Sequence, residues 1–129
     1  MLPFSISLRA GVPIHQQVVY AVVRAVASGR MAPGDPFPSV RVLSQELGIN
    51  PNTAHKVVAT LTADGLLIVR PGIGTVISER WNQGRAGQRA VVEEDVERLV
   101  VESRRAGLSL QDVLASIRRH WSRVFPRTG

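Results

Sequence analysis

A six-residue stretch at positions 48–53, GINPNT, most constrains the fold of this chain. Gly48 can end one helix, and Asn50 can cap the next, with Pro51 at its first helical position. Apolar residues recur at helical spacing on both sides of the stretch. The sequence therefore predicts two short helices joined by a tight turn.

Each of these two helices has its own boundary signals and its own apolar face. Ser39 stands where an N-cap is expected before residues 40–47, and Gly65 ends the helix that Asn50 begins. The residues expected to face inward are Val42, Leu43 and Leu47 in the first helix and Ala54, Val57 and Leu61 in the second. Two helices so close in sequence form a helix-turn-helix pattern.

Segments on either side complete a small domain. Residues 13–28 predict a further helix, and the proline-rich residues 30–38 predict an ordered extended connection. The apolar positions of that helix at four-residue spacing are Val18, Val22 and Val26. Residues 66–78 hold two β-branched runs around PGIG, which predicts a hairpin. A hairpin after a helix-turn-helix makes a winged helix-turn-helix domain, which we expect over residues 1–80.

The charge of the chain indicates an acidic partner. Its 129 residues include sixteen Lys and Arg and ten Asp and Glu, for a formal net charge of +6 and a pI of about 11.4. Lys56 is the only lysine, and the planar guanidinium of arginine suits phosphates and base edges. High-GC codon usage would also enrich arginine. The charge favours nucleic acid as a partner, because net charge bears on partners and not on fold.

The second helix of the motif begins with residues suited to reading DNA. Short polar side chains at the entrance of a recognition helix can reach base edges, and Asn can pair with adenine through two hydrogen bonds. The expected contacts are Asn50, Pro51, Asn52, Thr53, His55 and Lys56. Other readings stay open, because Asn50 can act only as a cap, Thr53 can simply be solvated and His55 can be a bystander.

Two further groups are expected on the same surface. Ser39 and Arg41, at the start of the first helix of the motif, suit a phosphate group. The hairpin candidates are Arg70, Gly72, Gly74 and Thr75, which can lie along the minor groove or its phosphates. A solvated arginine at position 41 and ordinary turn chemistry at the glycines are the alternatives.

Residues 8–78 resemble the DNA-binding domain of the GntR family of bacterial transcription regulators. The segments GINPNTAHKV and RPGIGTV are most similar to the YtrA-type subfamily. The resemblance implies a phosphate contact for Arg41 in the family pattern PSxR, a recognition-helix entrance at residues 50–53 and a wing contact at Gly74. It also implies a dimer, a two-fold operator in the DNA and a small effector of unknown identity.

This chain departs from many members of that family at the helix entrance. They have arginine or threonine where it has Pro51 and Asn52, and arginine where it has His55. The base preference of distant relatives therefore does not carry over. His55 can either make a pH-sensitive contact or make none.

Residues 81–129 predict a connector and then two amphipathic helices. The first covers residues 89–106 and ends at Gly107, and Ser109 with Asp112 resembles a capping box at the start of the second. Their apolar stripes are Val92, Val96, Leu99 and Val100, then Leu110, Val113, Leu114, Ile117, Trp121 and Val124. Two such helices bury their stripes poorly alone, so a homodimer is expected. Packing against the chain's own first helix is the alternative, while YtrA-type members carry a two-helix dimerisation region here.

The charge is not concentrated in the winged part of the chain. Residues 1–80 hold seven basic and four acidic residues, and residues 81–129 hold nine and six, so each part has a net charge of +3. The arginines near the C-terminus are Arg118, Arg119, Arg123 and Arg127. We expect them to solubilise the helices, with contact to DNA phosphates as the alternative.

Enzymatic and membrane functions find little support in the sequence. The chain has no cysteine, and His15, His55 and His120 fall on three different helical segments without metal-ligand spacing. RPGIGT lacks the lysine and the helix of a phosphate-binding loop. No run approaches the roughly 20 apolar residues that a membrane helix needs. We expect no catalytic site, no metal and no cofactor, and a cytoplasmic protein.

The combined expectation is a sequence-specific DNA-binding regulator, a homodimeric repressor with a pseudo-palindromic operator. The resemblance suggests its own operon and neighbouring transporter genes as targets, and a small effector that releases it. The alternative is a winged-helix module for protein assembly without sequence-specific DNA binding.

Overall fold

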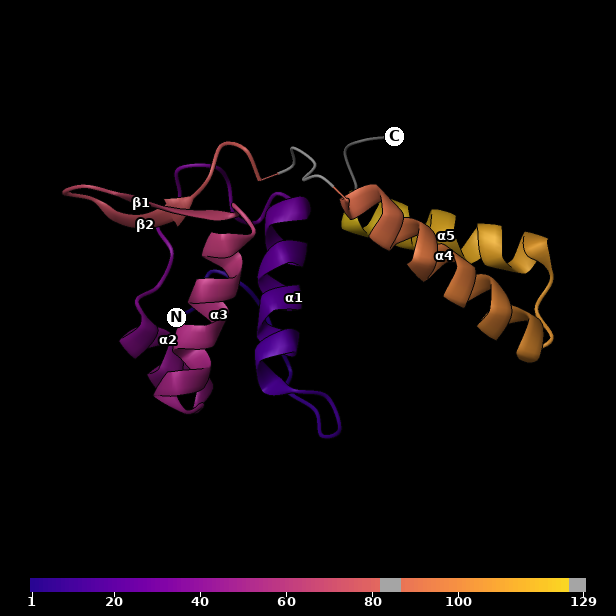
Figure 1. Ribbon diagram of the computed structural model, residues 1–129, viewed down its shortest axis with the longest axis horizontal. Helices are drawn as coiled ribbons and strands as arrows, with labels where there is room; N and C mark the ends of the chain where they lie inside the picture. The colour runs from indigo at the N-terminus through magenta and orange to yellow at the C-terminus, as the bar shows by residue number, and fades with distance from the viewer. Residues whose placement is uncertain (82–86, 126–129) are drawn as a thin grey trace. The chain divides into compact units, whose positions relative to one another are not determined.

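The computed structural model describes residues 1–81 and 87–125, and the chain divides into two compact units, residues 1–81 and 82–129 (Figure 1). The first unit contains α1 (Ile14–Ala27), α2 (Val40–Leu47), α3 (Pro51–Ala63), β1 (Leu67–Arg70) and β2 (Gly74–Ile77). The second contains α4 (Gln88–Arg105) and α5 (Leu110–Val124). These elements confirm the predicted mainly helical fold with one hairpin. The connector prediction for residues 82–86 and the role considered for Arg127 lie outside the described residues.

Three helices share one apolar core in the first unit. α1 and α3 lie side by side, and α2 packs against α3 (Figure 1). The core side chains with no exposed surface include Val18, Val22, Leu43, Ala54, Val57 and Leu61. Full burial of an aliphatic side chain stabilises a fold by about 1.5–3 kcal/mol. The apolar faces predicted for α1 and α3 therefore hold the unit together.

The predicted inward position of Val42 is wrong. Val42 is 41% exposed, whereas Leu43 beside it is fully buried. Successive helical residues are about 100° apart, so a stripe centred on Leu43 and Leu47 leaves Val42 outside it. Val40 instead completes the stripe and packs against the core.

The N-terminal segment before α1 belongs to the core, a role that sequence analysis did not assign to it. Phe4 is buried and stacks on Phe37 of the proline-rich connection, with ring centroids 6.3 Å apart and an interplanar angle of 5°. Met31 of the same connection is also buried. The core of the winged unit is thus closed by two segments outside its helices.

The connection between α1 and α2 also supports the hairpin. β1 and β2 pair in antiparallel register, with Leu67 opposite Ile77 and Arg70 opposite Gly74. On the other edge of β2, Gly34 N–H donates to the Ile77 carbonyl at 2.8 Å, and Ile77 N–H donates to the Asp35 carbonyl at 2.9 Å. β2 is therefore bonded on both edges, which fixes the base of the wing.

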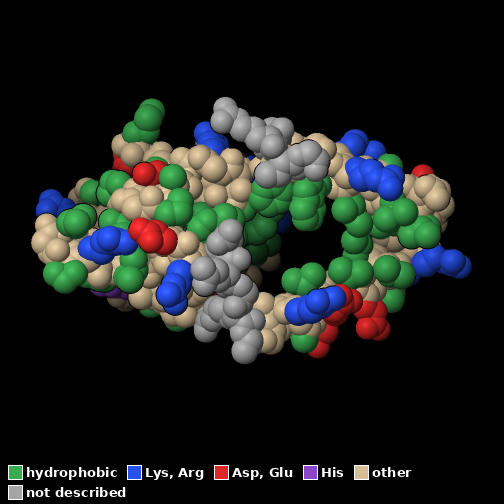
Figure 2. All heavy atoms as spheres, turned by 90° about the horizontal axis from the view of Figure 1, so that it is seen from above, with side chains coloured by type: hydrophobic (Ala, Val, Ile, Leu, Met, Phe, Trp, Pro, Cys, Tyr) green, Lys and Arg blue, Asp and Glu red, His purple; other side chains and the backbone are tan. Residues whose placement is uncertain are grey.

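The second unit exposes most of its apolar side chains. Ser103 is the only described residue of α4 or α5 that is buried. Leu99 and Trp121 are 42% and 58% exposed, while Val113, Leu114 and Val124 are only partly buried. Figure 2 shows hydrophobic side chains of this unit gathered together, with charged side chains around them. The predicted capping box is confirmed, with Ser109 and Asp112 bonded in both directions.

Candidate nucleic-acid interface

α3 begins where the sequence predicts, and its first turn is held by a side-chain cap. Asn50 Oδ1 accepts a hydrogen bond from the Asn52 backbone N–H at 2.8 Å, and Pro51 occupies the first turn. Bidentate pairing with adenine needs both the oxygen and the amide group of an Asn side chain. The Asn50 oxygen is already engaged, so the structure gives Asn50 the role of a cap.

Asn52 and Lys56 lie on the outer face of α3. They are four residues apart, on the side of the helix opposite the buried Ala54, Val57 and Leu61. Both side chains are exposed, and neither makes a side-chain hydrogen bond or ion pair within the described residues. This face offers two polar groups to a ligand.

The rest of this face of α3 carries small side chains. Ala59 is exposed and follows Lys56 by three positions, and Ala63 follows four residues later. Such short side chains let a helix approach the floor of a groove closely. His55 is exposed beside this face, and Thr53 is half-buried at its edge.

The start of α2 supplies a second group of candidates. Ser39 Oγ accepts a hydrogen bond from the Val42 N–H at 3.2 Å, so Ser39 is the predicted N-cap. Arg41 is exposed in the first turn and has no ion-pair partner among the described residues. Because α2 packs against α3, Arg41 is part of the same rigid unit as Asn52.

The wing turns through two glycines with positive φ. Gly72 has φ of 77° and Gly74 has φ of 114°, values that residues with a side chain rarely adopt. Ile73 between them is 73% exposed, and its N–H donates to the Arg70 carbonyl at 3.0 Å. Thr75 is half-buried, and its carbonyl accepts a hydrogen bond from the Phe37 N–H at 2.9 Å.

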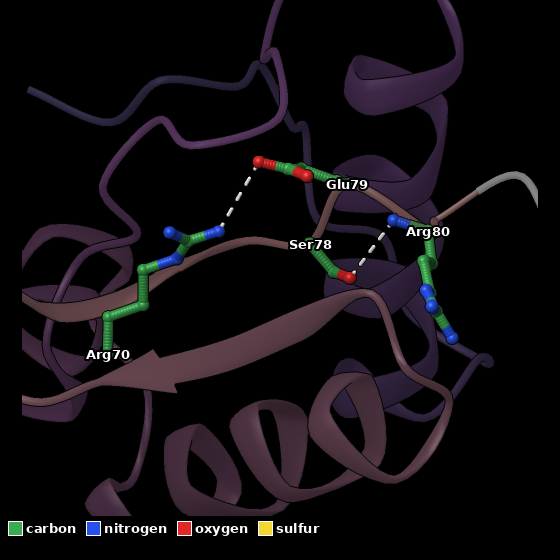
Figure 3. Close-up of polar contacts among 4 residues, drawn as sticks. All are labelled: Arg70, Ser78, Glu79 and Arg80. Atoms are coloured by element: carbon green, nitrogen blue, oxygen red, sulfur yellow. Dashed lines mark hydrogen bonds and ion pairs between the residues drawn. The ribbon is translucent and has the colours of Figure 1, made fainter.

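Arg70 has an intramolecular partner that sequence analysis missed. Its Nη2 atom lies 3.4 Å from Glu79 Oε1, and both side chains are solvent-accessible (Figure 3). Next to Glu79, Ser78 Oγ accepts a hydrogen bond from the Arg80 N–H at 3.1 Å, which shapes the chain as it leaves β2. The charge of Arg70 is therefore partly offset, unlike that of Arg41 or Lys56.

The three groups of candidates share a unit without touching one another through polar bonds. No hydrogen bond or ion pair in the described part of the chain joins the candidates on α2, on α3 and in the hairpin across these elements. Two other exposed residues of the wing, Ile73 and Glu79, were missed. Their signals were an apolar residue inside a turn and an acidic residue two positions after the end of β2.

The described residues offer little for metal chemistry. They contain no group of three or more His, Cys, Asp or Glu side chains that could hold a metal ion. None of their buried side-chain nitrogen or oxygen atoms lacks a hydrogen-bond partner. Among the helices described, none has the length and apolar character required to cross a membrane.

Comparison with known proteins decides the family. Residues 14–77 match the family described as bacterial regulatory proteins, gntR family. The chain is 32% identical over 104 residues to the HTH-type transcriptional repressor YtrA of Bacillus subtilis, with 80% of each chain covered. The chain belongs to the GntR family. The resemblance to its YtrA-type subfamily is likewise confirmed, and this GntR protein is a DNA-binding transcription regulator.

Solved structures agree with the fold of this GntR regulator. The chain is 26% identical to YtrA of Sulfolobus acidocaldarius, a GntR-family transcription factor, with a TM-score of 0.59 over 75% of this chain and 96% of that one. A transcriptional antiterminator from Listeria monocytogenes superposes with a TM-score of 0.83 over 94% of this chain and 91% of that one. The identity to the Listeria protein is 20%, so that likeness shows the fold alone.

Proposed function

We propose that this GntR regulator is a homodimeric, cytoplasmic repressor that binds a pseudo-palindromic operator in double-stranded DNA. The observation that carries the proposal is the exposed face of α3. There the side chains of Asn52 and Lys56 make no hydrogen bond or ion pair within the described residues, and small residues follow them. Asn is suited to an adenine edge, and Lys is suited to a phosphate or a guanine. The similarity to a protein named as a repressor supports the direction of regulation.

The proposed contacts follow from the three groups of candidates. α3 enters the major groove, the start of α2 contacts phosphates, and the wing lies along the minor groove or its phosphates. The proposed DNA-contacting residues are Ser39, Arg41, Asn50, Pro51, Asn52, Thr53, His55, Lys56, Arg70, Gly72, Gly74 and Thr75. Among them, Asn50 and Ser39 also serve as caps, so their part is to present backbone groups at the helix starts.

The proposed dimer rests on the apolar faces of α4 and α5. Leu99 on α4 and Ile117 and Trp121 on α5 remain largely exposed in the single chain. Large exposed apolar patches mark interaction sites in soluble proteins. A second copy placed on this face would bury both stripes and give the two-fold symmetry of a palindromic operator. Residues 82–129 are accordingly proposed as the dimerisation part of the chain.

The proposed target genes and effector rest on the family resemblance. We infer that the repressor acts on its own operon and on neighbouring transporter genes, and that a small effector releases it from DNA. Both follow from the YtrA-type resemblance rather than from any residue described above.

The test is fluorescence anisotropy of the purified protein with its own upstream DNA and with scrambled DNA, at two salt concentrations. The upstream fragment should bind roughly a thousand-fold more tightly or better, and both affinities should fall as salt rises, because cations leave the phosphates on binding. Lys56→Ala should weaken binding to both DNAs by the same factor. It should also reduce by about one the slope of the logarithm of affinity against the logarithm of salt concentration. Asn52→Ala should mainly remove the preference for the upstream fragment over scrambled DNA.

A matched control combines Gln111→Ala with Arg119→Ala on α5. It removes one amide group and one positive charge, as the Asn52→Ala and Lys56→Ala pair does, but in the second unit. The control should keep the preference for the upstream fragment. Equal, weak binding of both DNAs by the unmodified protein would reject sequence-specific binding and favour a module for protein assembly.

A further inference from the structure

A groove lies between the N-terminal segment and α1, away from the proposed DNA-binding residues. It has a volume of about 620 Å³, within the usual range for small-molecule sites. The lining residues come only from the N-terminal segment and α1, and they include Ser5, Ile6 and Arg9 of the segment and Tyr20, Ala21 and Arg24 of the helix. No residue of α2, α3 or the hairpin takes part.

One side chain fixes the wall of this groove. Gln17 Oε1 accepts a hydrogen bond from the Arg9 N–H at 3.0 Å, and Gln17 Nε2 donates to the Arg9 carbonyl at 2.9 Å and to the Val12 carbonyl at 2.8 Å. Farther along, Arg30 Nη1 donates to Ser5 Oγ at 3.2 Å, and Phe4 anchors the segment in the core. The segment is therefore held against α1 at several points, and the groove is formed before any ligand arrives.

The charge in the groove has one sign. Arg9 lines it from the N-terminal segment and Arg24 from α1, and no Asp or Glu is among the lining residues. Neither arginine makes an ion pair within the described residues. Arg30, through its bond to Ser5, places a third guanidinium at the border of the groove. Guanidinium groups bind carboxylates through two parallel hydrogen bonds.

An exposed aromatic ring completes the chemistry of the groove. Tyr20 is 67% exposed on α1, and Ile6 and Ala21 add apolar surface. Tyr20 and Arg24 lie about 200° and 240° around α1 from the buried Val18, so they are on the exposed side of the helix. The ring and the two arginines thus line the same open groove, and none of the three takes part in the core.

We propose that this groove binds a small organic anion in which a carboxylate is attached to a flat apolar group. The carboxylate pairs with Arg9 and Arg24, and the flat group packs on Tyr20. The site is independent of the proposed DNA contacts, so the loss of either proposal leaves the other standing.

The test is an NMR titration of the full-length, nitrogen-15-labelled protein with benzoate as the probe. Saturable shifts are expected for the backbone amides of Ser7, Arg9, Tyr20 and Arg24. Benzyl alcohol, which has the ring without the charge, should bind about ten-fold more weakly or worse, because charged hydrogen bonds are lost. The same titration with inorganic phosphate separates a carboxylate-and-ring site from a general anion site, which would bind phosphate as well as benzoate.

Two variants make the titration decisive. The double variant Arg9→Gln with Arg24→Gln should lower the affinity for benzoate about ten-fold or more. The double variant Arg118→Gln with Arg119→Gln, which makes the same charge change on α5, should leave that affinity unchanged. Arg24→Gln alone, whose side chain is exposed, serves if the double variant does not fold. Absent groove shifts, equal binding of benzyl alcohol or phosphate, or unchanged affinity in the folded variant would each overturn the proposal. A loss of DNA affinity as large as that of Lys56→Ala would reassign the arginines to DNA phosphates.

Discussion

The guanidinium of Arg70 lies 3.4 Å from the carboxylate of Glu79, so the predicted cation of the wing is already paired within the chain. Arg70 is 44% exposed and Glu79 is 75% exposed, so water screens the pair strongly. A phosphate approaching Arg70 must compete with this carboxylate and is also repelled by it. Glu79 therefore limits what the wing contributes to DNA affinity.

Glu79→Gln should tighten binding to DNA. An exposed ion pair is worth about 1 kcal/mol or less, so the gain is about two- to five-fold at low salt, for specific and scrambled DNA alike. The salt slope should steepen by up to about one, because Arg70 is then free to meet a phosphate. Anisotropy over a range of salt concentrations measures both effects.

Glu93→Gln on α4 is the matched control, since it removes one negative charge from an exposed position far along the chain. If both variants tighten binding equally, only net charge matters and the Arg70 pair has no special role. Weaker binding by Glu79→Gln would show instead that Glu79 orients Arg70 for its contact.

Asn50 is expected to matter first for stability. Asn50→Ala removes the cap of α3 and should lower the free energy of unfolding by about 1 kcal/mol, whereas Asn50→Ser keeps an oxygen acceptor and should lose less. Urea unfolding followed by circular dichroism measures the change. Asn52→Ala is the control, because its exposed side chain holds nothing in the described structure. If Asn50→Ala left the free energy of unfolding unchanged, the cap would contribute little to stability.

Phe4→Ala should be the more damaging change, although Phe4 precedes every helix. The ring is 5% exposed and stacks on Phe37, so its removal leaves a cavity that costs about 3–5 kcal/mol. Urea unfolding of the full chain should show this loss in the transition of the winged unit. Leu8→Ala, in the same segment but exposed, should change little. A mild effect of Phe4→Ala would mean that the segment detaches easily.

The sequence predicts the parts of this molecule that depend on local chemistry. Ser39, Asn50 and Ser109 cap helices because a short polar side chain can reach the backbone a few residues ahead, which spacing alone reveals. The stacking of Phe4 on Phe37 joins residues far apart in the chain, and no periodicity announces it. The start of α3 was predictable because its signals lie within a few residues of one another. The pairing of Arg70 with Glu79 was not, because it depends on how two side chains reach along the wing.

Leu99→Glu should convert the proposed dimer to a monomer. Leu99 lies on the apolar stripe of α4, and burying an unpaired carboxylate against a second copy costs several kcal/mol. Sedimentation velocity at micromolar concentration reads the change, while circular dichroism checks that the helices remain. Ala115→Glu, exposed on α5 opposite its apolar stripe, should stay dimeric. A dimeric Leu99→Glu would place the interface elsewhere, and a monomeric unmodified protein would reject the proposed dimer.

The capping box of α5 predicts a pH dependence. Hydrogen bonds from the backbone N–H and from the side chain of Ser109 hold the pKa of Asp112 below its ordinary value. The charged form is thus favoured in the folded chain, so the cap stabilises α5 above the ordinary Asp pKa of about 3.9. That stability is lost as the pH falls through the lowered folded value.

Carbon-13 NMR titration of the Asp112 carboxyl group measures this pKa directly. Ser109→Ala should return this pKa only part of the way toward the ordinary range, because the backbone N–H that bonds the carboxylate remains. It should also speed hydrogen exchange in the first turn of α5 at neutral pH, because the N-cap bond to the Asp112 N–H is lost. Ser122→Ala, near the other end of the helix, should do neither. An unchanged Asp112 pKa in Ser109→Ala would mean that the backbone N–H of residue 109, which the substitution keeps, holds the carboxylate charged without help from the serine side chain.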